Sequence, residues 1–219
     1  MSKTDCDLQK VITTIKRVNR AFKEPTVTTV ARGRDPFKVL ISCLLSLRTK
    51  DNVTSAASER LFRLADTPDA MLKLETLDIQ GAIYPVGFYR IKSARIKEIC
   101  RALIEEYGRN VPDDIDTLLK LPGVGRKTAN LVVTLGYGKP GICVDTHVHR
   151  ITNRWGYVRT KTPIETEFAL RKILPKKYWL IINDVLVTYG QNICTPVSPF
   201  CSRCRIYKYC ERAGVKSRR

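Results

Sequence analysis

Apolar side chains near the amino terminus recur at the spacing of one helical face. The apolar positions keep near-helical spacing, and basic residues lie between them: Leu8, Val11, Ile12, Ile15 and Phe22. An apolar stripe opposite a charged face is typical of an amphipathic helix that packs on a core. The pattern therefore predicts a helix at this end of the chain.

Helix starts recur further along, where a capping side chain stands directly before a proline. Asp35-Pro36 and Thr67-Pro68 each place a side-chain acceptor before a proline at the first helical position. Thr162 to Glu165 has the spacing of a capping box. Strand-like alternation is confined to "TVTTV" at 26–30 and "ICV" at 142–144, which are too short to build a sheet. The chain is therefore predicted to be all-α, with many short helices.

The charge of the chain indicates a polyanionic partner. Lys and Arg number 39 against 21 Asp and Glu, which gives the 219 residues a formal charge of +18. The excess of basic residues is densest in residues 141–219, which hold 15 basic and 5 acidic groups. The segment "GYGKPG" near residue 140 is the candidate domain boundary. Trp155 and Trp179 are isolated, and no basic amphipathic helix with an aromatic face stands out. Nucleic acid is therefore favoured over a lipid surface.

Targeting signals are not evident in the sequence. No apolar run approaches the roughly 20 residues needed to cross a bilayer, and "MSKTDCDLQKV" lacks the apolar core of a signal peptide. We expect a soluble, cytosolic protein, associated with the nucleoid if the source is prokaryotic. The eight cysteines are then not expected to form disulfides. Four of them are interpreted as small core residues: Cys6, Cys43, Cys100 and Cys143.

The remaining cysteines form a compact array near the carboxyl terminus. The array reads C-x6-C-x2-C-x5-C and could bring four thiolates to one point: Cys194, Cys201, Cys204 and Cys210. Zinc sites with four thiolates usually show two C-x2-C pairs, whereas an iron-sulfur cube needs thiolates at wider separation. Spacing alone leaves zinc and iron-sulfur open. The intervening Arg203, Arg205 and Lys208 indicate a structural centre that presents charge to a phosphate backbone.

A glycine-rich turn lies between two predicted helices in "TLLKLPGVGRKTANLVV". We expect a short helix from about residue 113, a tight turn at Pro122 to Gly125 and then a second helix. Glycine amides at a helix N-terminus let a phosphate approach closely, and the helix dipole favours an anion there. Such turns also occur for structural reasons, but the charge favours DNA-backbone binding without sequence readout. The predicted DNA-binding residues of the turn are Leu121, Gly123, Val124, Gly125 and Arg126.

Lys127 and Asp145 are the candidate reactive residues. Most lysines are solvated surface groups, but a partly shielded amine on a first helical turn beside Arg126 has its charged form disfavoured. A neutral lysine is a nucleophile capable of Schiff-base chemistry. Asp145 follows the apolar triplet of "ICVDTHVHR" and precedes a predicted helix. The alternative for Asp145 is a plain N-cap.

Three motifs together resemble one family. "LPGVGRKTAN", "VDTHVHR" and the cysteine array, in this order, closely resemble endonuclease III, the bifunctional DNA glycosylase and abasic lyase of base excision repair. The match runs from "DPFKVLISCLLS" at 35–46 through "VGFYRIKSARI" at 86–96 to the last cysteine. The resemblance implies a two-domain, all-α helix-hairpin-helix DNA glycosylase fold. A six-helix domain would span residues 29–139, and residues 1–28 and 140–219 would form an iron-sulfur cluster domain.

The resemblance also implies the chemistry. A 4Fe-4S cluster would occupy the four cysteines, and a monomer would bind double-stranded DNA that contains damaged bases or abasic sites, with no membrane partner. Lys127 would attack C1′ of a nucleotide flipped out of the stack, and Asp145 would stabilise the developing charge. The Schiff base would then allow β-elimination on the 3′ side. Oxidised pyrimidines such as thymine glycol are the expected substrates.

Two residues outside the glycine turn, Phe88 and Arg48, are also predicted to contact DNA. Phe88 in "VGFYR" stands at the wedge position of the family, although it could instead pack between helices. Arg48 stands where the family often has glutamine, and we predict that it contacts the orphaned base, because arginine can donate twice to a guanine edge. Tyr189-Gly190 replaces the family's "HG", and His147 is expected to have a supporting role.

Two other functions remain open. One is a mismatch uracil or thymine glycosylase, against which Lys127 argues, because relatives of that kind commonly lack this lysine. The other is a non-catalytic DNA-binding iron-sulfur redox module, against which the joint presence of Lys127 and Asp145 argues.

Overall fold

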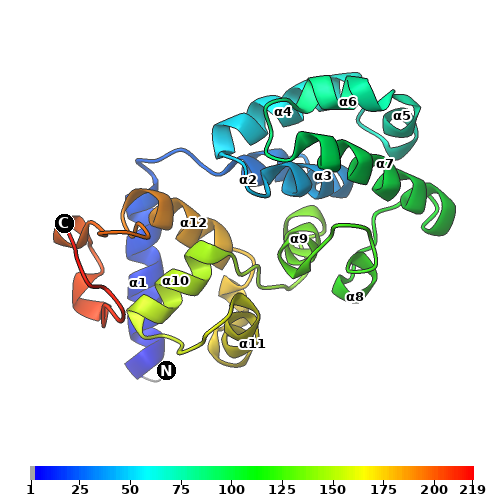
Figure 1. Ribbon diagram of the computed structural model, residues 1–219. Coiled ribbons are helices and arrows are strands. Elements are labelled where there is room, and N and C mark those ends of the chain that lie inside the picture. Colours follow the sequence, from blue (N-terminus) through cyan, green and yellow to red (C-terminus); the bar gives the residue numbers. More distant parts are fainter. Residues whose placement is uncertain (1–2) are drawn as a thin grey trace. The chain divides into compact units, whose positions relative to one another are not determined.

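The computed structural model describes residues 3–219, with side chains from residue 7 onward. The chain divides into two compact units, one made of Met1–Pro25 and Ile142–Arg219 and the other of Thr26–Gly141. The expected domain limits were residues 29 and 139, and their assignment to functional domains stays a prediction. Within the described residues every regular element is a helix, which confirms the all-α class (Figure 1). The Cys6 side chain lies outside the described side chains.

Among its described residues, the first unit has four α-helices and three short 3-10 turns. The α12 helix packs against α1 and α10. The predicted apolar face of α1 is buried at Leu8, Val11, Ile12 and Ile15, and Phe22 packs at the margin of the same core. The helical prediction for this segment is therefore confirmed. The elements are α1 (Lys3–Asn19), α10 (Thr146–Trp155), α11 (Pro163–Ile173), η2 (Lys176–Tyr178), α12 (Ile182–Asn192), η3 (Cys201–Arg203) and η4 (Tyr207–Tyr209).

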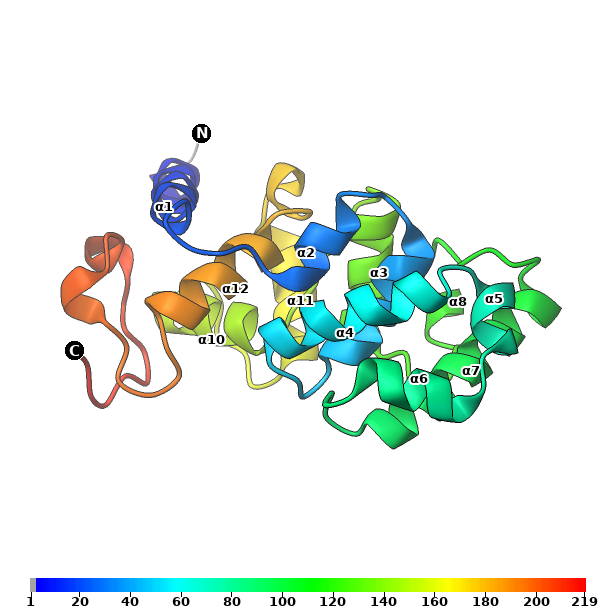
Figure 2. The same ribbon diagram turned by 90° about the horizontal axis from the view of Figure 1, so that it is seen from above.

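The second unit is built around α3. This helix contacts α2, α4, α7, α9 and η1, and its side chains are almost all apolar and buried, as expected for a central helix. Figures 1 and 2 show the neighbouring helices along it. The elements are α2 (Thr26–Ala31), α3 (Pro36–Ser46), α4 (Asp51–Leu64), α5 (Pro68–Lys73), α6 (Thr76–Ile83), α7 (Tyr89–Glu106), α8 (Ile115–Leu118), α9 (Arg126–Leu131) and the π-helical η1 (Val132–Gly136).

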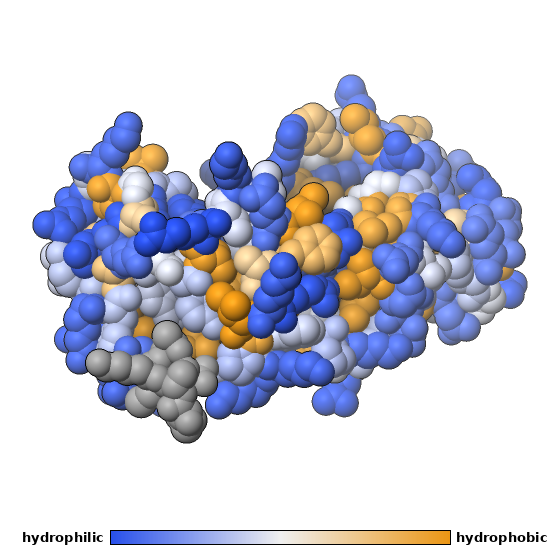
Figure 3. Space-filling model, turned by 90° about the horizontal axis from the view of Figure 1, so that it is seen from below, coloured by the Kyte–Doolittle hydropathy of each residue, from blue (hydrophilic) through white to orange (hydrophobic). Residues whose placement is uncertain are grey.

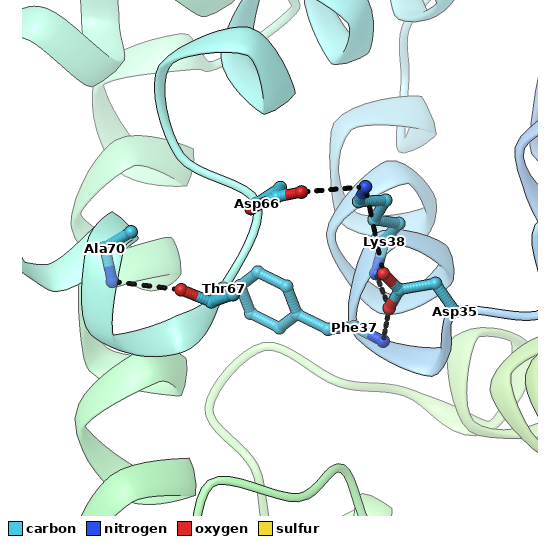
Figure 4. Close-up of polar contacts among 6 residues, drawn as sticks. All are labelled: Asp35, Phe37, Lys38, Asp66, Thr67 and Ala70. Atoms are coloured by element: carbon cyan, nitrogen blue, oxygen red, sulfur yellow. Dashed lines mark hydrogen bonds and ion pairs between the residues drawn. The ribbon is translucent and has the colours of Figure 1, made fainter.

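The predicted caps form as the sequence indicates. Asp35 Oδ1 accepts from the backbone N–H groups of Phe37 and Lys38 at 2.9 and 3.1 Å (Figure 4). In the same view Thr67 Oγ1 accepts from the Ala70 N–H at 3.2 Å. Each such cap contributes about 1 kcal/mol to stability. The starts of α3 and α5 are therefore determined by local sequence.

The capping box at α11 forms with one difference. Thr162 Oγ1 accepts from the Glu165 N–H at 3.2 Å, as predicted. The Glu165 carboxylate returns to the N–H of Lys161 at 3.0 Å, one residue before the usual partner. Hydrogen bonds to the charged form lower the pKa of Glu165, and those from Lys161 and Thr162 are the main cause.

The strand-like segment at 26–30 is helical in the structure, because a distant carboxylate caps it. The N–H of Thr26 donates to both carboxylate oxygens of Asp51 at 3.0 and 3.1 Å, and its Oγ1 donates to the Asp51 carbonyl at 3.0 Å. The cap comes from the start of α4, so a local reading of "TVTTV" could not identify it. Residues 142–144 form no regular element.

The surface in Figure 3 is mostly hydrophilic, with apolar groups exposed among the charged ones. Exposed apolar side chains of the second unit include Leu77, Tyr84, Phe88 and Ile91. Among the described helices, none combines the length and the apolar character that a membrane span requires.

Candidate active site and cysteine centre

The glycine turn joins α8 to α9 through a tight hydrogen-bonded loop. Asp114 caps α8, which begins at Ile115, slightly later than the expected start near 113. The N–H of Val124 donates to the Leu121 carbonyl at 3.1 Å and closes the turn. Gly123 has φ +77°, in the left-handed region that a type II turn requires at its third position. Leu121 and Val124 are buried and anchor the turn in the core of its unit.

Gly125 has a different role from Gly123. It is the N-cap of α9 with an ordinary φ of −98°, and a Cβ built on it would meet no heavy atom within 4 Å. Neither the backbone nor the packing of the protein requires glycine here. The missing side chain leaves open space before the first turn of α9, where N–H groups point outward at the positive end of the helix dipole.

Lys127 lies on that first turn and is half-buried. Its charge acts on the buried thiol of Cys43 in α3. Burial raises the pKa of the Cys43 thiol to about 12, and the charge of Lys127 partly opposes this rise. Next to it, Thr128, Ala129 and Asn130 are buried, so α9 holds the lysine at the edge of the core. The lysine is therefore placed by packing as well as by the turn.

Asp145 is the N-cap of α10, which confirms the cap interpretation. Its Oδ1 accepts from the N–H groups of His147 and Val148, both at 2.9 Å. Both cap bonds use the same oxygen, so Oδ2 takes no part in the cap. The half-buried carboxylate can therefore hold the helix start and still present an oxygen to a ligand.

Two arginines on α10 connect this helix to the loop of the first cysteine. Arg150 donates to the carbonyls of Gly190 and Cys194 at 3.2 and 2.8 Å and lies 3.0 Å from His147 Nδ1. A Cβ on Gly190 would lie 2.4 Å from His147 Nδ1, which explains the glycine of the Tyr189-Gly190 pair. Arg154 donates to the Thr195 carbonyl at 2.7 Å. The sequence motifs did not single out either arginine, although their i, i+4 spacing places them on one face of the helix.

The four cysteines of the array line one small cavity of about 30 Å³. Burial raises the pKa of Cys201 and of Cys210, and the neighbouring Cys204 and Cys194 raise it further. Tyr189, fully buried, places its Oη 3.2 Å from the Sγ of Cys204. Four thiols around a common space repel one another once ionised, so a positive centre between them would stabilise the thiolate forms.

Four thiols that line one cavity are a donor set that either a zinc ion or an iron-sulfur cluster could use. Across the part of the chain that the structure describes, no three His, Cys, Asp or Glu side chains are arranged to hold a metal ion. A tetrahedral zinc site requires four ligands close to one point. An iron-sulfur cluster instead holds its thiolates apart around a shared volume.

Arg48 and Phe88 come together on adjacent loops of the second unit. The Arg48 guanidinium lies 5.7 Å from the centroid of the Phe88 ring, and Phe88 is 56% exposed. The alternative in which Phe88 packs between helices is therefore wrong. By contrast, Cys43, Cys100 and Cys143 are buried, which confirms them as core residues.

Comparison with known proteins identifies the family. Residues 41–176 match the family model described as HhH-GPD superfamily base excision DNA repair protein. The chain is 49% identical over 197 residues to endonuclease III of Thermotoga maritima, covering 90% of this chain and 88% of that protein. The structure of a trapped endonuclease III-DNA covalent intermediate, an estranged-adenine complex, aligns with a TM-score of 0.83 and 34% identity over 97% of both chains. The chain belongs to the endonuclease III family.

Membership in the endonuclease III family makes the chain a DNA glycosylase and abasic-site lyase of base excision repair. The fold predicted from the three motifs is therefore confirmed. A thermostable thymine-DNA glycosylase also aligns, with a TM-score of 0.82 and 25% identity over 96% of this chain and 98% of that one. The shared fold thus accommodates more than one base specificity.

Proposed function

We propose that this enzyme removes oxidised pyrimidines from double-stranded DNA through a Schiff base on Lys127 and then cleaves the strand by β-elimination. Asp145 is the supporting carboxylate, and a monomer carries out both steps. The proposal rests on the position of Lys127, which is half-buried on the first turn of α9, directly after Gly125. A phosphate held at that turn brings the adjacent sugar within reach of the amine.

The residue chemistry accounts for each step. The neutral amine of Lys127 forms a bond to C1′ while the glycosidic bond breaks, and the base departs with the bonding electron pair and takes up a proton. Ionised Asp145 stabilises the positive charge that develops on the sugar. The sugar ring opens to an iminium ion, which acidifies the C2′ proton. Loss of that proton expels the 3′ phosphate, and water then releases the lysine.

The surrounding residues support a DNA substrate. Gly125 leaves the start of α9 open, and the side chain of the adjacent Arg126 supplies positive charge. Arg48 and Phe88 present a cation and an aromatic ring on adjacent loops, a combination that can enter a base stack when a nucleotide is flipped out. In this proposal Phe88 is the wedge and Arg48 contacts the orphaned base.

The residues that would hold a 4Fe-4S cluster are Cys194, Cys201, Cys204 and Cys210. When bound, such a cluster supplies a rigid, electron-transfer-competent centre that organises the carboxyl-terminal loop. The chain's own residues then present Arg203, Arg205 and Lys208, all exposed, to a phosphate backbone. Iron and sulfide analysis of anaerobically purified protein tests the assignment. Four iron atoms per chain are expected, and stoichiometric zinc would contradict it.

Borohydride trapping tests the catalytic proposal. Wild-type protein is incubated with a duplex that contains one thymine glycol, and the imine is reduced to a stable adduct. The adduct should form with wild type, disappear with Lys127→Ala and persist with Lys120→Ala, a matched control because Lys120 is an exposed lysine just before the same turn. An adduct that survives Lys127→Ala would show that another amine is the nucleophile.

A mismatch thymine or uracil glycosylase is the second candidate, favoured by the structural similarity to the thymine-DNA glycosylase. Duplexes with thymine or uracil opposite guanine, assayed beside thymine glycol under single-turnover conditions, separate the two. Faster excision from the mismatches than from the thymine glycol duplex would favour this candidate.

A further inference from the structure

Lys92 is a buried lysine that the catalytic proposal does not use. It lies on α7 and is 5% exposed. Its ammonium donates to the carbonyls of Leu45 and Leu47 at 2.8 and 2.5 Å and to Oγ1 of Thr49 at 3.2 Å. All three acceptors are neutral oxygens. A buried ammonium needs such partners, because burying it without them is costly.

The two carbonyls belong to the end of α3, which terminates at Ser46. The last carbonyls of a helix lack intrahelical partners and lie at the negative end of its dipole. Lys92 therefore caps α3 from a different helix. It also fixes the direction in which the chain leaves α3 toward Arg48.

The Thr49 hydroxyl extends the same network to a second loop. Its Oγ1 accepts from the N–H of Gly87 at 3.2 Å, and donates to the Leu47 carbonyl at 3.2 Å. A Cβ on Gly87 would lie 2.6 Å from the Arg48 carbonyl, so only glycine permits this approach. The loop before α4 and the loop before α7 are thus joined by backbone contact and by one hydroxyl.

Each joined loop displays one strained residue. Arg48 has φ 52° and Phe88 has φ 60°, left-handed conformations that are unusual for large side chains. Such conformations persist where the surrounding structure enforces them. In these positions the guanidinium lies 5.7 Å from the ring centroid, a cation–π distance.

We propose that Lys92 is a positioning residue that, through Thr49 and Gly87, holds Arg48 and Phe88 as one preassembled probe for entering the base stack. The proposal rests on the proposed action on duplex DNA. Opening a stacked base pair costs a few kcal/mol, and a probe that is already ordered loses no further conformational freedom when it enters. Lys92 therefore acts on base extrusion and not on the bond-breaking step.

The test compares extrusion-dependent and extrusion-independent excision. The lesion is thymine glycol, placed either in a fully paired duplex or in a central unpaired bubble, and single-turnover rates are measured for both. We expect Lys92→Met to slow excision roughly tenfold in the duplex, with less than a twofold change in the bubble. Equal slowing on both substrates, or no slowing, would overturn the proposal.

Lys97→Met is the matched control. Lys97 lies on the same helix and donates to the Leu74 carbonyl at 2.6 Å, at the end of α5, away from the two loops. It should leave the duplex-to-bubble ratio unchanged. Thr49→Val removes only the bridging hydroxyl and should lower the duplex rate selectively even if Lys92→Met fails to fold. A wild-type ratio in a folded Thr49→Val variant would contradict the bridge.

A double-mutant cycle and a fluorescent probe complete the test. Phe88→Ala in the Lys92→Met background should add little to the duplex defect, because the probe is already disordered, whereas additive effects would overturn the proposal. Fluorescence of 2-aminopurine beside the lesion should rise with wild type and less with Lys92→Met. Inactivity of wild type on both substrates would instead contradict the thymine glycol assignment, and the fluorescence would still decide the role of Lys92.

Discussion

The carboxylate of Asp145 caps α10 through Oδ1 alone, so its structural and chemical contributions can be separated by mutation. Asn caps helices as well as Asp does, because its side-chain oxygen accepts the same N–H bonds. Asn lacks the negative charge that would stabilise a cationic sugar. The two contributions therefore respond differently to Asn and to Ala.

We expect Asp145→Asn to leave the unfolding midpoint unchanged and to lower excision by roughly 10²- to 10³-fold. Asp145→Ala should show the same loss of excision and also lose about 1 kcal/mol of stability. Circular dichroism and single-turnover excision measure the two effects. If the Asn variant excises at the wild-type rate, the carboxylate is only a cap.

The buried Lys92 makes the free energy of unfolding vary with pH in the alkaline range. Burial lowers the pKa of Lys92 from 10.5 to about 8 in the folded protein. Between these values the unfolded chain binds more protons than the folded one, so the free energy of unfolding rises with pH. The contribution is on the order of 3 kcal/mol across this window.

The stability of wild type relative to Lys92→Met should therefore increase from pH 8 to pH 10.5. Urea denaturation at constant ionic strength measures the difference, and the other titrating groups cancel between the two proteins. A difference that stays constant over this range would contradict the lowered pKa of Lys92 in the folded protein.

At the scale of elements, the two glycines in the turn between α8 and α9 have different structural roles. Gly123 adopts φ +77°, and the Arg95 side chain is the nearest group to a Cβ there, at an ordinary 3.6 Å. The strain of Gly123→Ala would come from the backbone. Gly125 has an ordinary φ and open surroundings, so its substitution is tolerated by the fold.

We expect Gly123→Ala to lower stability by about 1 kcal/mol. Gly125→Ala should keep wild-type stability but weaken DNA binding about fivefold, because a methyl group would obstruct a phosphate at the helix start. Thermal denaturation and fluorescence anisotropy separate the two variants. Wild-type affinity in Gly125→Ala would show that the phosphate does not approach there.

Short helices with distant partners organise the second unit. The six-residue α9 packs on α3, which sets the direction of its first turn and of Lys127. The α2 helix depends on Asp51 for its cap. Elements of this length are marginal alone, so their tertiary contacts stabilise them.

At the scale of the whole molecule, the cationic side chains that give the net charge of +18 make two kinds of contact. Both units contain ion pairs, such as Arg109 with Asp69 at 3.0 Å in the second unit and Arg159 with Glu211 at 3.2 Å in the first. Other cations contact aromatic rings, and in the first unit the guanidinium groups of Arg203 and Arg219 lie 5.8 and 3.8 Å from the centroid of the Phe200 ring. A ring face holds these arginines without neutralising their charge, so the carboxyl-terminal region keeps a strong positive field.

DNA binding should therefore weaken steeply with salt, with a log-log slope of about −0.9 per neutralised phosphate. Arg126→Ala should make the slope shallower by about 0.9, because one phosphate contact is lost. Titrations of an undamaged duplex at several salt concentrations provide the slopes. An identical slope in the variant would exclude Arg126 from the phosphate contacts.

Local chemistry made much of this protein predictable from its sequence. The caps at Asp35, Thr67 and Thr162 need only residues two or three positions away. The apolar face of α1 follows from helical periodicity, and the cap at Asp145 follows from the residue type before a helix. The motif order also predicted the family. Lys127 and the four cysteines were found by the same motifs, and their roles stay proposals.

The tertiary structure decided the features whose partners lie far apart in the chain. Sequence could not show that Asp51 caps α2, or that Arg48 meets Phe88 on a neighbouring loop. The helical spacing of Lys92 with Ile96 and Ile99 was a signal for burial, but its acceptors lie more than 40 residues earlier. Local sequence thus determined the helix starts and the residue types of the site. Only folding brought distant carbonyls, rings and thiols together, because those contacts depend on how whole helices pack.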